Sequence, residues 1–355
     1  MLRTQREKMQ VCVESTLIFL DNAWRQSHPR NRMAKVAFLV TAWLLVMIAL
    51  FHQFFDQHSD LTSQSTIQDT KIPGPINKYG HSPFPRKIWQ IYLTPPNANK
   101  STFHVDPGNI ADAVSWLAHN PDYEYTLVGE EGAETIVRYR FKEQPVLLGI
   151  FNGLRNTGMK SDLLRYLILS TEGGIYSDID TENLKPIDKW VPERYQKEVR
   201  VVVGVEFDRL NGNNWAEVHP DLQFCQWTIA TTPGHPLFTY MIEWVVSALE
   251  EFRLASNTTY SKLSPSSSEV MKLTGPSAWT DAVFRHLQSY DSELVSLRNL
   301  SGLTEPKLIG DILILPIDGF GVGQGHSNST HDGTIPEDAL VRHKFRGSWR
   351  HEDKI

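Results

Sequence analysis

The sequence of 355 residues predicts an α/β domain, with one mostly parallel sheet covered by helices on both faces, behind an N-terminal transmembrane helix. Strand-like and helix-like patterns alternate from residue 85 onward, which is typical of this fold class. Residues 201–205 form a continuous apolar run, as a strand that is buried on both faces requires. Ten tryptophans and 16 phenylalanines supply large apolar side chains for a core.

The apolar stretch at residues 36–55 predicts the transmembrane helix. Its 20 residues carry no formal charge and are enough for a helix across about 30 Å of hydrocarbon. A buried core helix and a cleaved signal peptide are the alternatives, but 35 residues precede the stretch and no small-residue cleavage site is obvious. Residues 1–35 carry seven Lys or Arg, and the next basic residue is Lys71. The positive-inside bias therefore predicts a single-pass type II membrane protein with a cytosolic tail at 1–35.

Residues 56–84 are polar and rich in Ser, Thr, Gln and Asp, which indicates a solvated luminal stem. The globular domain is then expected over residues 85–355. Four Asn-x-Ser/Thr sequons lie beyond the apolar stretch and support a luminal location: Asn99, Asn257, Asn299 and Asn328.

Charge and cysteine content exclude two other classes. The formal net charge is -6 and no basic run occurs, which argues against a nucleic-acid partner. Cys12 and Cys225 would lie on opposite sides of the membrane, so no intramolecular disulfide framework is expected.

Within the domain, apolar periodicity and breaking residues predict the order of the elements. Strands are expected at residues 88–92, 201–205 and 312–316, with a further strand and turn from 224. Helical patterns occur at residues 159–172, 236–249 and 279–287, and residues 110–118 and 147–153 are helical or mixed. Residues 264–268 read as a surface loop and 319–325 as a glycine-rich loop.

Residues 159–180 are the most informative part of the sequence. Read as a helix, the first part places Asp162 and Arg165 on one face at i,i+3. A different, apolar stripe consists of Leu163, Leu164, Leu167 and Ile168. Gly173 and Gly174 then stop the helix, because glycine adopts the left-handed conformation without a Cβ penalty.

Two acidic residues follow these glycines. Residues 175–180 alternate so that Tyr176, Asp178 and Asp180 are expected on one face of a strand. Two carboxylates about 6–7 Å apart can bracket a divalent cation and its waters. Such a cation, completed by diphosphate oxygens, neutralises the leaving group of a nucleotide sugar. An isolated Asp-x-Asp triplet is also common by chance, and a solvated strand end is its ordinary interpretation.

The combination of motifs is more specific than the triplet. Ser161-Asp-x-x-Arg-Tyr166, Gly173-Gly-Ile-Tyr176 and Asp178-x-Asp180 occur at fixed spacing. This pattern resembles the core of glycosyltransferase family 32, which has a GT-A fold, and of the large clostridial cytotoxin glucosyltransferases. Further stretches are similar to the same family: residues 85–90, 180–188, 223–229, 233–236, 274–276 and 343–349.

The resemblance implies a GT-A-type nucleotide-sugar transferase domain. It implies transfer of mannose from GDP-mannose to an N-glycan or glycoprotein acceptor in α-1,6 linkage, with Mn²⁺ as the metal. It also implies a Golgi membrane location and, as partners, subunits of a Golgi mannosyltransferase complex. Ser277 and Asp221 depart from the pattern, because a glycine and a basic residue are expected there.

The expected site residues combine this resemblance with the chemistry of the side chains. The metal set is Asp178, Asp180 and His343, with His326 as the rival histidine. Asp162 is expected to hold sugar hydroxyls, and Arg165 is expected to hold a phosphate oxygen. The catalytic set is Asp178, Asp180, Asp162 and Arg165. The donor-binding set is Trp89, Gln90, Asp162, Arg165, Gly173, Gly174 and Trp349.

Several roles stay open at this level. Trp89 and Gln90 fit a core position as well as a base pocket. Lys160 lies near the expected diphosphate, although a solvated helix-end lysine is the favoured interpretation. An α-linked product from an α-linked donor requires retention, for which we favour same-face attack assisted by the leaving diphosphate. Glu206 is the alternative nucleophile or base.

Two further functions compete with an N-glycan mannosyltransferase. One is a hexosyltransferase of the same fold that acts on a sphingolipid or another glycan. The late apolar run at 312–317 is too short for the additional membrane span that lipid-directed relatives carry. The other is a non-catalytic subunit of a Golgi complex, against which the intact set of Asp162, Arg165, Asp178 and Asp180 argues.

Overall fold

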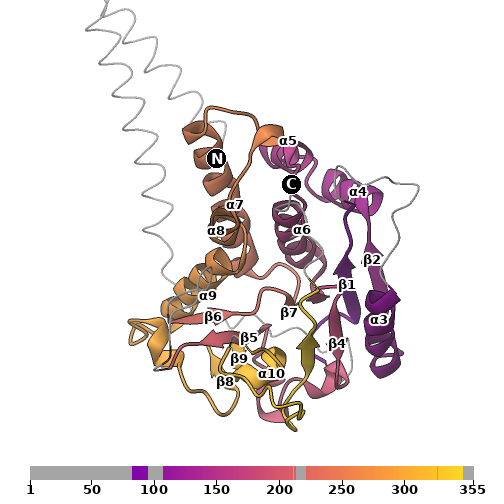
Figure 1. The fold of residues 1–355 in the computed structure, drawn as a ribbon, viewed down its shortest axis with the longest axis vertical. Coiled ribbons are helices and arrows are strands. Elements are labelled where there is room, and N and C mark those ends of the chain that lie inside the picture. The colour runs from indigo at the N-terminus through magenta and orange to yellow at the C-terminus, as the bar shows by residue number, and fades with distance from the viewer. Residues whose placement is uncertain (1–81, 95–106, 211, 213–220, 326, 347–355) are drawn as a thin grey trace, which may run out of the picture. The chain divides into compact units, whose positions relative to one another are not determined.

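A computed structural model of the chain describes residues 82–94, 107–210, 212, 221–325 and 327–346 (Figure 1). All of them belong to one structural unit, residues 73–355. The predicted cytosolic tail, the apolar stretch at 36–55 and the predicted stem up to residue 81 lie outside the described residues. Within the described part, no helix is both long and apolar enough to cross a membrane.

The main sheet has eight strands. They are β1 (Lys87–Ile91), β2 (Glu124–Val128), β3 (Gly174–Ser177), β5 (Val201–Asp208), β6 (Leu222–Phe224), β7 (Thr228–Thr231), β8 (Lys307–Ile309) and β9 (Ile312–Leu315). Their order is β2-β1-β3-β7-β5-β9-β8, and β6 pairs with β5 off this path. A separate two-stranded sheet pairs β4 (Thr181–Asn183) with β10 (Val341–His343).

The direction of the strands confirms the α/β class but makes the sheet mixed. β1, β2, β3, β5 and β9 run one way, and β6, β7 and β8 run the other way. β7 lies antiparallel between β3 and β5, in the middle of the sheet. The carboxyl ends of β1, β3 and β5 therefore meet at one edge, which is where open α/β sheets bind ligands.

The α-helices are α3 (Pro107–His119), α4 (Glu130–Arg140), α5 (Pro145–Gly153), α6 (Thr157–Glu172), α7 (Pro236–Ala255), α8 (Ser267–Leu273), α9 (Pro276–Tyr290) and α10 (Ile317–Gly321). Short 3₁₀ helices are η1 (Ile187–Lys189), η2 (Glu193–Tyr195), η3 (Tyr260–Lys262) and η4 (Leu297–Leu300). Figure 1 shows α6 beside α7 and α8, and α10 in front of β5 and β9.

Helices cover both faces of the sheet, as the sequence predicts. Val201 and Val203 of β5 enter a core that they share with side chains of α4 to α9. Val202, between them, enters a second core with Trp116 of α3 and Phe320 of α10. Successive residues of a strand point to opposite faces, so an unbroken apolar run is needed to fill both cores.

Helix α6 is buried on nearly every side. Met159, Lys160 and residues 162–169 are all buried, because α6 packs against α4, α7, α8 and β3. The single apolar stripe that the sequence predicts is therefore too narrow. Asn156 caps the helix by accepting a hydrogen bond from the Met159 amide over 2.9 Å.

Gly173 and Gly174 end α6 with positive φ angles of 61° and 90°, as the sequence predicts. A Cβ atom on Gly174 would lie 2.6 Å from the carbonyl oxygen of Lys87 on the neighbouring strand β1. This close approach lets the chain turn from the helix directly into the centre of the sheet.

Most predicted elements occur with shifted ends, but two predictions are wrong. The strand expected at 175–180 ends at Ser177, and the chain turns before it enters β4. Thr181 Oγ1 stabilises this turn by donating a hydrogen bond to the Asp178 carbonyl over 2.6 Å. The glycine-rich loop expected at 319–325 begins inside helix α10.

Candidate active site

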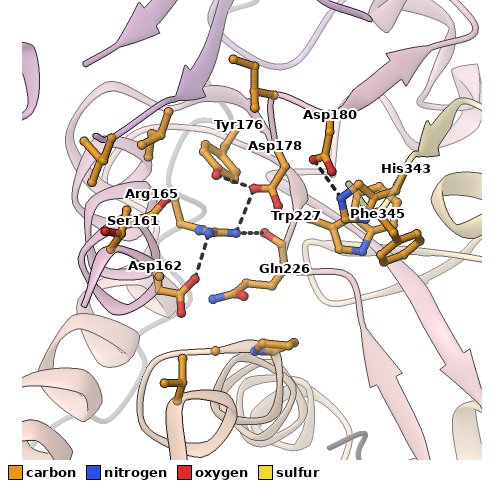
Figure 2. Close-up of a pocket in the computed structure, with 18 of the residues that line it drawn as sticks. Ser161, Asp162, Arg165, Tyr176, Asp178, Asp180, Gln226, Trp227, His343 and Phe345 are labelled. Carbon is orange, nitrogen blue, oxygen red and sulfur yellow. Dashed lines mark hydrogen bonds and ion pairs between the residues drawn. The ribbon is translucent and has the colours of Figure 1, made fainter. Parts of the chain in front are cut away.

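One cavity lies at the edge where β1, β3 and β5 end (Figure 2). Helix α6 contributes Asp162 and Arg165, and the turn after β3 contributes Asp178 and Asp180. His343, the last residue of β10, comes from far along the chain. The structure thus brings these five predicted site residues together around one space.

Arg165 lies at the centre of this group. Its Nη2 contacts Asp162 Oδ1 at 2.8 Å, which is the predicted i,i+3 pair, and its Nη1 contacts Asp178 Oδ1 at 3.3 Å. The guanidinium lies over the ring of Tyr176, 4.7 Å from its centroid. Burial lowers the pKa of Arg165, but Tyr176 and the two carboxylates raise it further, to well above its ordinary value. The side chain therefore carries a fixed positive charge although it is only 5% exposed.

Asp162 is held from two sides. Besides Arg165, Thr274 Oγ1 donates to its Oδ2 over 2.8 Å. Burial raises the pKa of Asp162 to about 6, even though the Arg165 charge and the Thr274 hydrogen bond lower it. Thr274 precedes α9, so this contact ties the start of α9 to the middle of α6.

Asp178 has one occupied and one open carboxylate oxygen. Its Oδ1 accepts hydrogen bonds from Tyr176 Oη over 2.5 Å and from Arg165 over 3.3 Å. Its amide donates to the Trp227 carbonyl over 2.8 Å, which fixes the backbone after the end of β3. No donor among the described residues reaches Oδ2, which is left for a ligand.

Asp180 is bound by the C-terminal segment. His343 Nε2 lies 3.0 Å from its Oδ1, and the Arg346 amide donates to its Oδ2 over 2.8 Å. Burial raises the pKa of Asp180, but the hydrogen bonds from His343 and the Arg346 amide outweigh that effect and hold the pKa below its ordinary value. Asp180 is thus held as a carboxylate.

The two carboxylates and the imidazole fit a divalent cation. One ligand atom each from Asp178, Asp180 and His343 lies within 4.8 Å of the others. Carboxylate oxygens suit hard cations such as Mn²⁺, and a neutral imidazole also ligates divalent metals. Among the described residues, His343 Nδ1 is buried without a hydrogen-bond partner, and the ring makes tilted contacts with the rings of Trp227 and Phe345.

Four predicted donor-binding residues lie behind the cavity rather than in its lining. Trp89 packs in the core, and its Nε1 donates to the Gly173 carbonyl over 2.9 Å. Gln90 Nε2 donates to the Asp178 carbonyl over 2.9 Å. Gly173 and Gly174 make close backbone contacts with neighbouring strands. Gln90 thus holds the acidic turn, and the other three hold the chain where α6 ends. The end of β1 lines the cavity instead through residues 91–93.

Three other predictions concern single side chains. Lys160 is not a solvated helix-end lysine: it is buried, contacts Glu130 Oε1 at 2.5 Å and lies over the ring of Phe151. Trp349 and the rival His326 lie outside the described residues. The unexpected Asp221 pairs with Arg298 at 2.9 Å and does not line the cavity.

Glu206 also lines the cavity, from strand β5. It is 7% exposed, and Gln223 Nε2 donates to its Oε2 over 2.9 Å. Burial raises the pKa of Glu206 above its ordinary value, and the Gln223 hydrogen bond only partly opposes this rise.

Sequence reasoning missed the polar support under Asp162 and Arg165. Gln226 Nε2 donates to Tyr166 Oη over 2.5 Å and to the Thr274 carbonyl over 2.9 Å, and the backbone carbonyl of Gln226 accepts from Arg165 Nη1 over 3.3 Å. Sequence reasoning also missed Phe345, which lines the cavity and contacts the ring of His343. Gln226 lies within a stretch that resembles the family, so the residue was visible, but nothing in the local pattern indicated its partners.

This arrangement of a buried Asp–Arg pair, an Asp-x-Asp turn and an α/β sheet defines a class, the DXD-containing glycosyltransferases. Residues 110–197 match the family model "Glycosyltransferase sugar-binding region containing DXD motif". The initiation-specific alpha-1,6-mannosyltransferase of Schizosaccharomyces pombe is 33% identical, over 84% of this chain and 71% of that protein. The chain belongs to this family, glycosyltransferase family 32, and is a glycosyltransferase.

Two other similar proteins have related names. The initiation-specific alpha-1,6-mannosyltransferase of Candida albicans is 29% identical, over 76% of this chain and 72% of that protein. Among solved structures, the PaToxG glycosyltransferase aligns with a TM-score of 0.39 and 21% identity, over 61% of this chain and 75% of that one.

Proposed function

We propose that this protein transfers mannose from GDP-mannose to an N-glycan acceptor, in α-1,6 linkage and with retention of configuration. The observation that carries the proposal is the convergence of Asp178, Asp180 and His343 beside Arg165 in one cavity. The names of the relatives in S. pombe and C. albicans support mannose as the sugar and α-1,6 as the linkage. The domain that carries the cavity is, in this proposal, a GT-A domain at residues 85–355.

The Asp178, Asp180 and His343 side chains would hold the divalent cation, which we propose to be Mn²⁺. A bound cation supplies neutralisation of the negative charge on the diphosphate leaving group. Arg165 adds a fixed positive charge next to Asp178, suited to a phosphate oxygen. Asp162, which Arg165 and Thr274 orient, is suited to accept hydrogen bonds from sugar hydroxyls.

The proposed transfer proceeds on one face of the sugar. The bond between the anomeric carbon and the diphosphate breaks, and its electron pair stays on the diphosphate oxygen. The acceptor hydroxyl oxygen bonds to the same face of the anomeric carbon, and its proton passes to that diphosphate oxygen. The protein's part is to exclude water from the cavity and to hold charged groups in place there, where they act more strongly than in water.

The location of the enzyme is part of the same proposal. We propose a single-pass type II protein of the Golgi membrane, with the tail at 1–35, the span at 36–55 and the stem at 56–84. Trp349 would cover the bound donor from the C-terminal segment, and association with other mannosyltransferase subunits is a further proposed property. The charge bias around residues 36–55 supports this orientation.

One assay tests the function. The full chain is incubated with GDP-mannose, other GDP-sugars and UDP-sugars, an oligomannose acceptor, and either Mn²⁺ or a chelator. We expect transfer from GDP-mannose alone, loss of activity with chelator, and an α-1,6 product by NMR. Transfer from a different nucleotide sugar would mean that GDP-mannose is not the donor. A metal-independent rate would refute the proposed role of the acidic turn.

A further inference from the structure

Glu206 lines the cavity at an irregularity in its strand. Between β5 and β6, Val205 pairs with Phe224 and Phe207 pairs with Gln223, so the register shifts at the residue between them. A β-bulge of this kind leaves one residue without a partner across the ladder and turns its side chain in a new direction. The bulge at Glu206 coincides with its entry into the cavity lining.

Asp208, the next acidic residue on β5, is a carboxylate with a structural role. Asp208 accepts hydrogen bonds from Ser301 Oγ over 2.6 Å, from the Gly302 amide over 2.7 Å and from the Leu210 amide over 3.1 Å. Both of its oxygens are occupied, and the contacts join β5 to the loop after η4. Asp208 does not line the cavity.

Glu206 differs from Asp208 because it lines the cavity and has fewer hydrogen-bond partners. It is equally buried, yet among the described residues its direct partners are Gln223, which donates to Oε2 over 2.9 Å, and the side chain of Trp227. Among the described residues no Lys or Arg forms an ion pair with it. A buried carboxylate with so few partners is costly for folding, so its presence in a cavity wall points to a ligand.

We propose that Glu206 stabilises the positive charge that develops on the transferred sugar as its bond to the diphosphate breaks. This inference rests on the proposed function, because it takes the sugar to lie next to the Asp178, Asp180 and His343 group. Glu206 forms no bond to the anomeric carbon and exchanges no proton in this role. Its anionic carboxylate lowers the energy of the cationic transition state electrostatically.

Gln223 is the positioning residue in this arrangement. Its amide holds Oε2 of Glu206 from the neighbouring strand and is itself 2% exposed. One oxygen is thereby fixed to the protein, while the carboxylate as a whole faces the cavity. A donor amide on Oε2 also favours the ionised form of the carboxylate, which partly opposes the effect of burial.

The test compares two reactions of the full chain. Hydrolysis of GDP-mannose without acceptor and transfer to an oligomannose both require cleavage of the same bond to the diphosphate. Glu206→Gln keeps the shape of the side chain and removes its charge. We expect kcat to fall about 100-fold in both reactions, with KM for GDP-mannose and Kd for GDP within about twofold. Glu206→Asp keeps the charge and should retain more activity than Glu206→Gln.

Three results would overturn the assignment. Loss of transfer with unchanged hydrolysis would make Glu206 a base for the acceptor hydroxyl. A covalent glycosyl adduct on Glu206, seen by mass spectrometry, would make it a nucleophile. Loss of GDP binding together with a lower Tm would make it a structural residue. Glu172→Gln is the matched control, because Glu172 is a half-buried acid that pairs with Lys87 and Arg140 outside the cavity.

The outcome also separates this inference from the proposed function. A wild-type chain that turns over GDP-mannose, with Glu206→Gln equal to it, refutes the role of Glu206 alone. A wild-type chain that cleaves no nucleotide sugar refutes the proposed function, and the role of Glu206 with it.

Discussion

His343 Nε2 lies 3.0 Å from Asp180 Oδ1, although the two residues are 163 positions apart in the sequence. The contact follows from strand pairing, because β10 runs antiparallel to β4 and places His343 opposite Thr181, the residue after Asp180. The Lys344 amide then donates to the Asp180 carbonyl over 2.9 Å. The C-terminal segment is therefore part of the candidate metal centre.

Removal of the acidic pair should abolish turnover without unfolding the chain. Asp178→Ala, Asp180→Ala and Asp180→Asn each remove an expected ligand from the rim of a cavity rather than from a packed core. We expect kcat to fall by at least about 100-fold. Mannosyl transfer and thermal unfolding should be measured together, and a near-normal rate of Asp180→Ala without added metal contradicts the assignment.

His343→Ala should weaken the metal site selectively. We expect the apparent affinity for Mn²⁺ to fall by about 10–100-fold, the usual cost of disturbing a metal-site residue. Mn²⁺ titration of activity and of bound metal in the folded variant checks this. An unchanged titration would transfer the third-ligand role to His326 or to water.

The turn at Gly174 should not tolerate a side chain. Gly174→Ala introduces a Cβ 2.6 Å from the Lys87 carbonyl oxygen at a φ of 90°. We expect the free energy of unfolding to fall by about 1–3 kcal/mol. Gly149→Ala in α5 is the control, because no atom lies within 4 Å of its added Cβ, and it should be neutral or stabilising. Urea denaturation of both variants compares them directly, and equal stability would argue against the backbone contact.

Asp162 should make stability depend on pH. Its pKa is raised from 3.8 to about 6 in the folded chain, so the folded state binds the proton more tightly than the unfolded state does. Protonation of Asp162 therefore stabilises the folded chain at low pH. This stabilisation is lost as pH rises from about 4 through about 6, and the free energy of unfolding falls by about 3 kcal/mol in total.

The difference in unfolding free energy between the wild type and Asp162→Asn isolates this effect. We expect the difference to shift against the wild type as pH rises through that window. Asp122→Asn serves as the control, because the Asp122 side chain is 80% exposed. A difference that does not change with pH would show that the pKa of Asp162 is not raised.

The membrane topology can be tested with sealed microsomes. Protease added from the cytosolic side should remove only residues 1–35, and digestion of the domain would refute the type II orientation. Among the sequons in the described residues, Asn257 is exposed after α7, whereas Asn328 Nδ2 already donates to the Asp208 carbonyl. We therefore expect Asn257→Gln to remove an endoglycosidase-sensitive glycan and Asn328→Gln to have no such effect.

Local features of the site could be read from the sequence. The i,i+3 spacing of Asp162 and Arg165, the glycine stop and the apolar run of β5 depend on residues that are neighbours in the chain, and local periodicity reports such relations. The turn at Asp178 was misread as strand, because alternation continues past Ser177 while the partner strand does not.

The sequence by itself determined the α/β class, the acidic motif at Asp178 and Asp180, and the helix that carries Arg165. Each of these is a pattern within about 20 residues. Only the tertiary structure decided which side chains surround them. Thr274 reaches Asp162 across 112 positions and His343 reaches Asp180 across 163, through strand order and helix packing. The irregularity of β5 at Glu206 likewise depends on the register with β6. Such pairings follow from how all the elements pack together, and no local stretch of sequence carries that information.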